Sequence, residues 1–481
     1  MRNALALAAS ALALTAQAAW AQSSTAPAAS SAATPTQTAS VTPPAGAPPT
    51  APTLPAPLTR AQLWAACVNV SAAQQAIDTC SQIIQANRES DVNIGIAFFN
   101  RGNAHMSLHN AQQAADDYTQ ALAHNFQQAD VYYGRGTARN ALGQFNDALA
   151  DYNTAITANP NHAEAINNRG NVYELGLHDT THAIADYSAA IAIRDDALFR
   201  YNRGHAHQYG AHDLANALVD YNRAIELNPA FADAHLERGN VYFAESNFDA
   251  AVTDYQAALS AHPDYALAYY NLGKAYEAQG HKQDAISQWS EALRVNPQYA
   301  DALISRGKAN YDLRRYESAL ADFSAAIAIG PDAIAFNGRG LVYQNGRSDP
   351  DHAIADFDRA AALAPTNAEF NNNSCWARAV ANRDLDTART RCDAAINAAD
   401  QAPFFMSRGL IGLRQNRNLD AWNDYDSAVR RAQSNAAYLY GRGIAALRLG
   451  RAGEGQADIA AASARDPNIA SVYQGYGVTP P

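Results

Sequence analysis

The sequence predicts an all-α fold, a solenoid of stacked helical hairpins, and three observations lead to this prediction. A glycine recurs at intervals close to 34 residues through most of the 481-residue chain. An aromatic residue follows almost every one of these glycines at a nearly constant distance, and a proline often follows the aromatic residue. A period of this length indicates that each repeat is one pair of helices that buries its apolar face against the neighbouring pairs.

The anchor glycine sets the period. Successive spacings are 34, 34, 34, 35, 34, 34 and 33 residues, and the next step of 69 residues spans two periods, with Cys375 where a glycine is expected. The repeats predict about eleven full hairpins and a shortened one at the N-terminal end, over residues 60–466. The anchors are Gly102, Gly136, Gly170, Gly204, Gly239, Gly273, Gly307, Gly340, Gly409 and Gly443.

The aromatic slot marks the second helix of each hairpin. In one unit Ala148, Tyr152 and Ile156 are four residues apart and therefore share one helical face. Pro160 then ends that helix, because proline cannot continue it. The aromatic slot holds Tyr118, Tyr152, Tyr187, Tyr221, Tyr255, Trp289, Phe323, Phe357 and Tyr425.

With these Gly, Ala, aromatic, Ala and Pro slots, the chain resembles the tetratricopeptide repeat family from about residue 60 to residue 481. The resemblance implies two antiparallel helices per unit, here called helix A for the one with the anchor and helix B for the one with the aromatic residue. It also implies a right-handed superhelix with a concave groove. Pentatricopeptide-type RNA binders have a similar period, but a net charge of −11 and the lack of a basic stripe exclude nucleic acid as a partner.

Arginine precedes the anchor in nine units, and aspartate precedes the helix B aromatic slot in nine units. The two exceptions coincide, since Leu272 goes with Gln288 and Ser374 goes with Arg391. We therefore predict a structural salt bridge between the two helices of the same unit. The pairs are Arg101–Asp117, Arg135–Asp151, Arg169–Asp186, Arg203–Asp220, Arg238–Asp254, Arg306–Asp322, Arg339–Asp356, Arg408–Asp424 and Arg442–Asp458.

The four cysteines fall in the same slots. Cys375 replaces an anchor glycine and Cys392 replaces the aromatic residue of that unit, whereas Cys80 occupies the aromatic slot of the shortened unit, 13 residues after Cys67. Cys375 and Cys392 are 17 residues apart. Cys67 and Cys80 are closer by one helical turn, so their side chains keep the same helical face. Both pairs predict a disulfide from helix A to helix B in an oxidising compartment. A metal site is the alternative, although the cysteines lack CxxC spacing.

Helix A lines the groove in tetratricopeptide repeat proteins, and this resemblance implies that the slots near two and three residues before the anchor, and one and four after it, face the ligand. Here those slots are neutral and rich in amides, which donate and accept hydrogen bonds and so suit an extended peptide backbone. The alternative is that these amides only solvate helix A. The predicted groove residues are Asn100, Asn103, Asn168, Asn171, Asn202, His205, Asn240, Asn271, Lys274, Lys308, Asn337 and Asn372.

Four tyrosines three residues before an anchor leave two interpretations open: Tyr133, Tyr201, Tyr270 and Tyr440 either stack on a sugar or pack between adjacent helices. Thirteen histidines carry no metal-ligand spacing, and no HExxH, GxSxG, GxxxxGK or dinucleotide-binding motif is present. We expect no enzyme activity, no cofactor and no metal.

The N-terminal end predicts export. Arg2 precedes a short apolar stretch, and Ala19-Trp20-Ala21 fits a signal peptidase site, so residues 1–21 are a predicted signal peptide. An uncleaved anchor is the alternative, and no later segment resembles a transmembrane span. Residues 22–59 have no charged side chain and nine prolines, which is typical of a disordered tether. The expected location is the periplasm or the outside of the cell.

The last residues, 467–481, depart from the repeat, and Ile469, Val472, Tyr473 and Tyr476 are predicted to cap the exposed face of the final hairpin. The sequence as a whole predicts an exported, non-enzymatic scaffold that holds a segment of an envelope protein in its concave groove. A glycan- or cell-wall-binding envelope module is the alternative. The fold does not identify the partner, the pathway or the oligomeric state.

Overall fold

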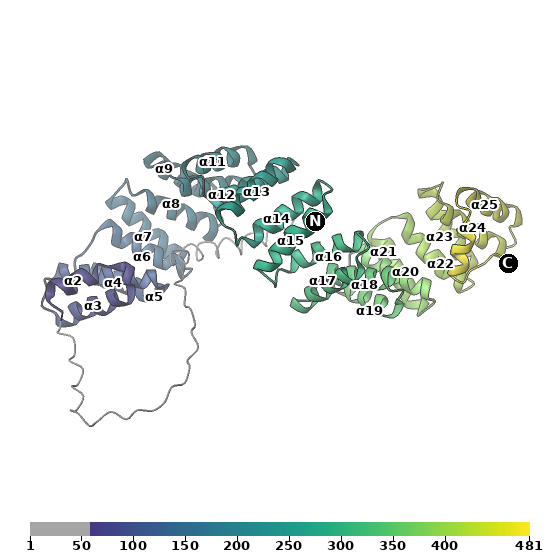
Figure 1. Cartoon of the computed structure of the whole chain (residues 1–481), viewed down its shortest axis with the longest axis horizontal. Helices are drawn as coiled ribbons and strands as arrows, with labels where there is room; N and C mark the ends of the chain where they lie inside the picture. Colours follow the sequence, from purple (N-terminus) through teal and green to yellow (C-terminus); the bar gives the residue numbers. More distant parts are fainter. Residues whose placement is uncertain (1–57) are drawn as a thin grey trace, which may run out of the picture. The chain divides into compact units, whose positions relative to one another are not determined.

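The computed structural model describes residues 58–481, and within them the regular elements are all helices (Figure 1), which confirms the all-α prediction. The predicted signal peptide, residues 1–21, and almost all of the predicted tether, residues 22–59, lie outside the described residues. Among the helices of residues 58–481, none has the length and apolar character that crossing a membrane requires.

The described chain divides into two compact units, residues 58–241 and 242–481, with the boundary inside α12 (Ala232–Ala244). The sequence predicts one solenoid over residues 60–466 and gives no sign of this division. The two units are described separately below.

The N-terminal unit begins with a short hairpin, α2 (Arg60–Cys67) and α3 (Ala73–Ala86), joined by the 3₁₀ turn η1 (Val70–Ala72). From α2 to α11 each helix contacts the next along the chain. The remaining elements are α4 (Asp91–Ser107), α5 (Ala111–Ala123), α6 (Ala129–Ala141), α7 (Phe145–Ala158), α8 (Ala163–Asn171), η2 (Val172–Gly176), α9 (Thr180–Ile193), α10 (Ala197–His205), η3 (Ala206–Gly210) and α11 (Leu214–Leu227).

The C-terminal unit continues the alternation of helix A and helix B, and each helix from α13 to α25 contacts the next. Its elements are α13 (Phe248–Ala261), α14 (Ala266–Ala278), α15 (Lys282–Val295), α16 (Ala300–Asp312), α17 (Tyr316–Ile329), α18 (Ala333–Gly346), α19 (Pro350–Leu363), α20 (Ala368–Ala381), α21 (Leu385–Ala398), α22 (Ala402–Arg414), α23 (Asn418–Arg431), α24 (Ala436–Arg448), α25 (Ala452–Arg465) and α26 (Ile469–Gly475). In chain order, α4 to α25 make up eleven helix pairs after the short one, as the repeats predict.

The anchor glycine lets helix A and helix B approach closely. A Cβ atom on Gly102 would lie 2.8 Å from Cε1 of Tyr118, the aromatic residue of the same unit. The Tyr118 ring is buried against that backbone. The recurring glycine therefore reflects a packing requirement, since any side chain at this position would displace the ring that fills the hairpin core.

In three of the glycine-anchored units the aromatic slot lies 17 rather than 16 residues after the anchor, and these three units accommodate the extra residue in the same way. Two of them end helix A in a π-helical turn, η2 and η3. The same widened hydrogen bond closes α18, where the amide of Arg347 donates to the carbonyl of Val342. An aspartate then caps helix B in each of the three: Asp179, Asp213 and Asp349.

Eight of the nine predicted arginine–aspartate bridges are formed within one hairpin, with an Nη or Nε atom 2.6–2.8 Å from a carboxylate oxygen. The aspartates are almost completely buried. Of the ninth pair, Arg238 belongs to the N-terminal unit and Asp254 to the C-terminal unit. The eight bridges are Arg101–Asp117, Arg135–Asp151, Arg169–Asp186, Arg203–Asp220, Arg306–Asp322, Arg339–Asp356, Arg408–Asp424 and Arg442–Asp458.

Each arginine also reaches back to helix B of the preceding hairpin, a contact that the sequence analysis missed. Nη1 of Arg101 donates to Ser81 Oγ at 2.9 Å, and Nη1 of Arg203 donates to Ser188 Oγ at 3.0 Å. In one of the two hairpins without the pair, Ser374 and Arg378 donate to Asp358 in the same slot, both at 2.7 Å. The arginine slot thus joins three helices rather than two.

Both predicted disulfides are present, Cys67–Cys80 and Cys375–Cys392, and all four cysteines are fully buried. The second replaces the contact between glycine and aromatic ring with a covalent bond across the same hairpin. The metal alternative for the cysteines is therefore wrong.

Candidate functional site on the helix A face

The twelve predicted groove residues lie on the A helices of the two units, and we call the surface they form the helix A face. Eleven of the twelve are partly buried and Lys308 is exposed. Several consecutive A helices contact each other directly, including α4 with α6 and α16 with α18. Side chains on this face therefore meet across successive hairpins.

Amides on the helix A face of the N-terminal unit form hydrogen bonds between consecutive A helices. Asn168 Nδ2 donates to the hydroxyl oxygen of Tyr133 at 3.2 Å, and Asn202 Nδ2 donates to Asn167 Oδ1 at 3.0 Å. The C-terminal unit repeats this arrangement, because Asn373 Nδ2 donates to Asn337 Oδ1 at 2.8 Å. The amides thus serve packing, and each retains hydrogen-bonding capacity beyond these contacts.

Two predicted groove amides have a buried atom without a hydrogen bond within residues 58–481, namely Asn100 Nδ2 and Asn372 Oδ1. A buried amide group that makes no hydrogen bond costs free energy. A ligand that supplied a carbonyl to Asn100 or an N–H group to Asn372 would recover that cost.

A charged cluster lies among these amides in the N-terminal unit. Nδ1 of His205 is 2.7 Å from Oε1 of Glu174, and the hydroxyl of Tyr209 donates to Oε2 of Glu237 at 2.6 Å. Asn240 Nδ2 also donates to Glu237, at 3.0 Å. Burial of the ring lowers the pKa of His205, but the hydrogen bond to Glu174 and the charges of both glutamates outweigh burial and raise this pKa above its ordinary value.

The sequence analysis did not select Glu174 and Glu237, although both occupy slots of the helix A face, four residues after one anchor and two before another. They are single occurrences in slots where other units carry different residues, so no repetition marks them. The face is therefore locally acidic near His205 and not neutral throughout.

In the C-terminal unit a cavity of about 180 Å³ opens on the helix A face between α16 and α18. Lys308 and Asn337, two of the predicted groove residues, line it together with Tyr311, Ile334 and Leu341. It combines an ammonium group, the carboxylate of Asp312, an amide and apolar side chains, which is a composition suited to one peptide side chain and its backbone.

Lys274 does not present a freely exposed ammonium group. Its Nζ atom lies 5.2 Å from the centroid of the Phe243 ring and 5.6 Å from that of Tyr270. Burial lowers the pKa of Lys274. The lysine therefore packs along aromatic rings, with a cation–π contribution.

The four tyrosines three residues before an anchor pack between adjacent helices. Tyr270 lies 5.0 Å from Tyr299 between ring centroids, Tyr201 lies 5.1 Å from Phe231, and Tyr440 is almost fully buried. Packing accounts for these rings, so they do not support the sugar-stacking interpretation.

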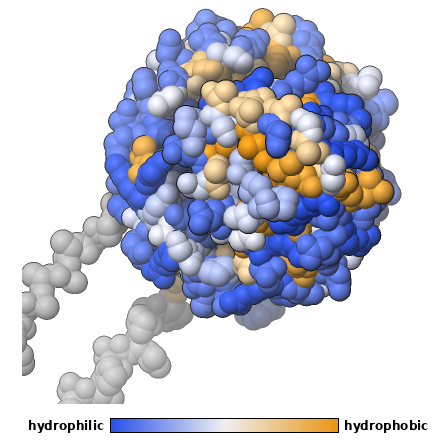
Figure 2. All heavy atoms as spheres, turned by 90° about the vertical axis from the view of Figure 1, so that its right-hand side faces the viewer, coloured by the Kyte–Doolittle hydropathy of each residue, from blue (hydrophilic) through white to orange (hydrophobic). Residues whose placement is uncertain are grey.

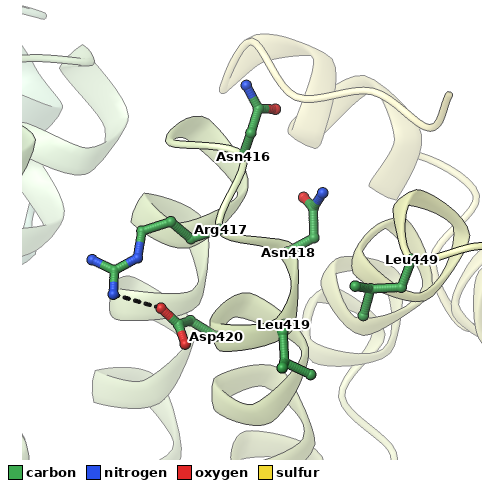
Figure 3. Close-up of a pocket in the computed structure, with 6 residues that line it drawn as sticks. All are labelled: Asn416, Arg417, Asn418, Leu419, Asp420 and Leu449. Atoms are coloured by element: carbon green, nitrogen blue, oxygen red, sulfur yellow. Dashed lines mark ion pairs between the residues drawn. The ribbon is translucent and has the colours of Figure 1, made fainter.

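A second cavity, about 410 Å³, lies away from the predicted groove residues (Figure 3). It is lined by residues 416–420, at the start of α23, and by Leu449, and the Arg417–Asp420 ion pair of 2.7 Å borders it. None of the slots of the helix A face contributes to it. Within residues 58–481 no three His, Cys, Asp or Glu side chains converge as metal ligands would.

Comparison with family models identifies the repeat. The TPR repeat model TPR_11 matches residues 136–176, 213–246 and 239–280, and the tetratricopeptide repeat model TPR_16 matches residues 270–334 and 406–471. The chain belongs to the tetratricopeptide repeat family. Its repeats imply a scaffold for protein–protein interaction.

Solved structures of several proteins resemble parts of this chain. The crystal structure of MamA is 27% identical and covers 34% of this chain and 96% of its own, with a TM-score of 0.32. That of YrrB, described as a TPR protein with an unusual peptide-binding site, is 24% identical and covers 39% and 97%, with a TM-score of 0.34. That of pilF from Pseudomonas aeruginosa is 20% identical and covers 44% and 96%, with a TM-score of 0.39. No curated protein sequence matches this chain.

Proposed function

We propose that this tetratricopeptide repeat protein is an exported, non-enzymatic scaffold that binds an extended segment of a partner protein along its helix A face. The observation that carries this proposal is the set of hydrogen-bonded amides on consecutive A helices within each unit, Asn168 and Asn202 in the N-terminal unit and Asn337 and Asn373 in the C-terminal unit. An extended peptide offers a carbonyl or an N–H group about every 3.3 Å, and side-chain amides satisfy both.

In the C-terminal unit, the cavity beside Lys308 adds a place for one side chain of a segment bound there. In the N-terminal unit, Glu174 and Glu237, near His205, favour a positively charged residue in a segment bound there. Alternating amides, a small cavity and a local charge would together give affinity from the peptide backbone and specificity from a few side chains.

The two disulfides support an exported location, since structural disulfides persist in oxidising compartments. The predicted signal peptide, residues 1–21, is consistent with it. We place the partner in the cell envelope for the same reason.

Affinity capture from crosslinked cell-envelope extract tests the proposal, with the chain as bait. A second bait carries Asn168→Ala, Asn202→Ala and Asn271→Ala. A matched control carries Gln113→Ala, Gln120→Ala and Gln283→Ala, which remove three exposed amides from B helices.

The proposal predicts that one protein is captured by both the unchanged bait and the control. The asparagine variant should capture at least tenfold less of it. Circular dichroism and thermal unfolding of all three baits establish that the variants are folded. Equal retention by all three would place binding elsewhere on the molecule and contradict the proposal. Recovery of polysaccharide instead of protein would favour the glycan alternative.

A further inference from the structure

The segment after the last hairpin lies against helix A of that hairpin. Tyr473 of α26 is fully buried, and its hydroxyl donates to the carbonyl of Ala437 on α24 at 2.6 Å. Its ring centroid is 5.1 Å from that of Tyr440. A Cβ atom on Gly441 would lie 2.6 Å from the Tyr473 hydroxyl. Tyr440 and Gly441 occupy the slots three and two residues before the anchor, so Tyr473 covers the helix A face.

The same segment reaches back two hairpins. The ring of Tyr476 lies 5.3 Å from the ring of Trp376 on α20, edge to face. Trp376 directly follows Cys375, which is the slot that Asn103 and Asn171 occupy in other units. A cap of the final hairpin would end at α24, whereas this segment contacts α24 through Tyr473, and α22 and α20 through Tyr476.

Two arginines hold the backbone of this segment. Arg414 on α22 donates from Nη2 to the carbonyls of Tyr476 and Val380, and Arg448 on α24 donates from Nη2 to the carbonyl of Thr479 at 3.2 Å. Both arginines stand five residues after an anchor. Arginines at one repeated slot therefore bind carbonyls of a crossing chain.

The charge of these arginines is not neutralised by an acid. Within residues 58–481 neither Arg414 nor Arg448 forms an ion pair, in contrast to the arginines that precede the anchors, and burial lowers the pKa of both. Arg414 Nε is also buried without a hydrogen bond in the same range. A partly buried guanidinium group held only by carbonyls is a site for peptide backbone.

We propose that the helix A face of α20, α22 and α24 is a peptide-binding surface and that its occupant is the chain's own C-terminal segment, residues 469–481. The segment acts as a bound ligand in cis and closes this stretch of the face to partner segments. The face of the N-terminal unit and the cavity beside Lys308 remain open. This inference rests on the proposed function only in treating the helix A face as the surface that binds peptides.

Many residues of the segment are exposed to solvent, so only a few side chains attach it to the helix A face. Val472 is exposed on α26, and residues 474, 475, 477 and 479 are exposed as well. Figure 2 shows apolar residues among hydrophilic ones on the C-terminal end of the molecule. The segment is therefore held mainly by Tyr473, Tyr476 and Val478 and by the two arginines. A second peptide of the same sequence would make the same contacts.

A labelled synthetic peptide of residues 466–481 tests the proposal by fluorescence anisotropy with the full chain. In the unchanged chain the resident segment competes with it. Tyr476→Ala with Val478→Asp weakens the resident segment, and we expect the peptide to bind this variant at least tenfold more tightly than the unchanged chain. Adding Trp376→Ala and Arg414→Gln should remove the gain. In the matched control, the weakened variant carries Arg417→Gln instead, which removes the ion pair with Asp420. The gain in peptide binding should then remain.

Equal binding to the unchanged chain and the weakened variant would overturn the proposal, as would a gain that survives the loss of Trp376 and Arg414. If the weakened variant does not fold, hydrogen exchange of Arg414→Gln in an otherwise unchanged chain replaces it. Faster exchange confined to residues 469–479 supports a bound ligand. An equal increase in exchange throughout α24 and α25 would show that the segment is an ordinary part of the terminal core and would overturn the proposal. Neither result depends on the asparagines of the N-terminal unit, so failure here and failure of the proposed function are distinguishable.

Discussion

Arg101 and Asp117 stand on the two helices of one hairpin, and Nη2 of the arginine lies 2.6 Å from Oδ1 of the aspartate. The arginine donates from Nε to the other carboxylate oxygen at 2.8 Å and from Nη1 to Ser81 of the preceding hairpin. One side chain thus fixes the angle within its own hairpin and the contact with the previous one. Repetition of this contact along each unit keeps the A helices in register and so builds the helix A face.

We predict that Asp322→Ala destabilises the C-terminal unit by about 2–3 kcal/mol, because it leaves the guanidinium group of Arg306 partly buried without its carboxylate. Urea unfolding measures the change. Replacing the pair with Arg306→Leu and Asp322→Gln copies the Leu272 hairpin and should recover most of the loss.

The exposed Arg294–Glu291 pair is the control, since Glu291→Ala should cost less than about 1 kcal/mol. Equal effects of Asp322→Ala and Glu291→Ala would contradict a structural role for the buried bridge.

A second prediction concerns the cysteine hairpin. Cys375→Ser with Cys392→Ser should lower stability by about 3 kcal/mol, the chain-entropy contribution of a loop of this size. Cys375→Gly with Cys392→Tyr restores the glycine and ring of the other hairpins and should recover part of that loss. Thermal unfolding under non-reducing conditions compares them. If the Gly/Tyr variant were less stable than the Ser/Ser variant, the proposed equivalence of the two solutions would be wrong.

Glu89 gives a pH dependence to the first hairpin. The hydrogen bond from Arg60 lowers the pKa of Glu89 to about 2, aided by Trp64 and Asn93 against the effect of burial. A carboxyl group whose pKa is lowered in the folded state stabilises it above the unfolded pKa of about 4.3. This contribution decreases as the pH falls below about 4.3 and is fully lost once the pH has fallen through about 2.

Hydrogen exchange in α2, compared between pH 6 and pH 3, measures this effect. We expect faster opening at pH 3 in the unchanged chain and little difference between the two pH values in Glu89→Gln. An unchanged chain without pH dependence over this range would contradict the assigned role of Glu89.

We predict that the pKa of His205 lies above the ordinary value for histidine, and NMR of its imidazole protons measures this pKa directly. A raised pKa means that the His205–Glu174 pair stabilises the fold fully below about pH 6.5. That contribution is lost as the pH rises through the raised pKa. Glu174→Gln should lower the His205 pKa. A pKa at or below the ordinary value in the unchanged chain would mean that burial, not Glu174, dominates.

Much of the fold is predictable because the regular repeat allows each unit to be compared with the other units of the chain. The joint exceptions at Leu272 and Gln288 identify the arginine–aspartate bridge, and the slots of Cys375 and Cys392 identify a disulfide. Such inferences need no three-dimensional information, since residues in equivalent slots have equivalent surroundings. The eleven helix pairs follow from the same regularity.

What the sequence analysis missed is what does not repeat. Tyr476 and Trp376 are 100 residues apart, and no periodic signal links them. The bond from Asn202 to Asn167 depends on side-chain directions between two helices, which slot positions alone do not give. The division into two compact units also has no counterpart in the spacing.

The central claim is that the helix A face, and not the B helices, contacts the partner. The most direct measurement places a photo-crosslinking amino acid at Asn171 or Lys308 on the face, and at Gln120 or Gln283 on B helices, in the cells that produce the protein. The account predicts that the same partner protein crosslinks from Asn171 and Lys308 and not from Gln120 or Gln283. Crosslinks to a partner from the B helices alone would contradict it.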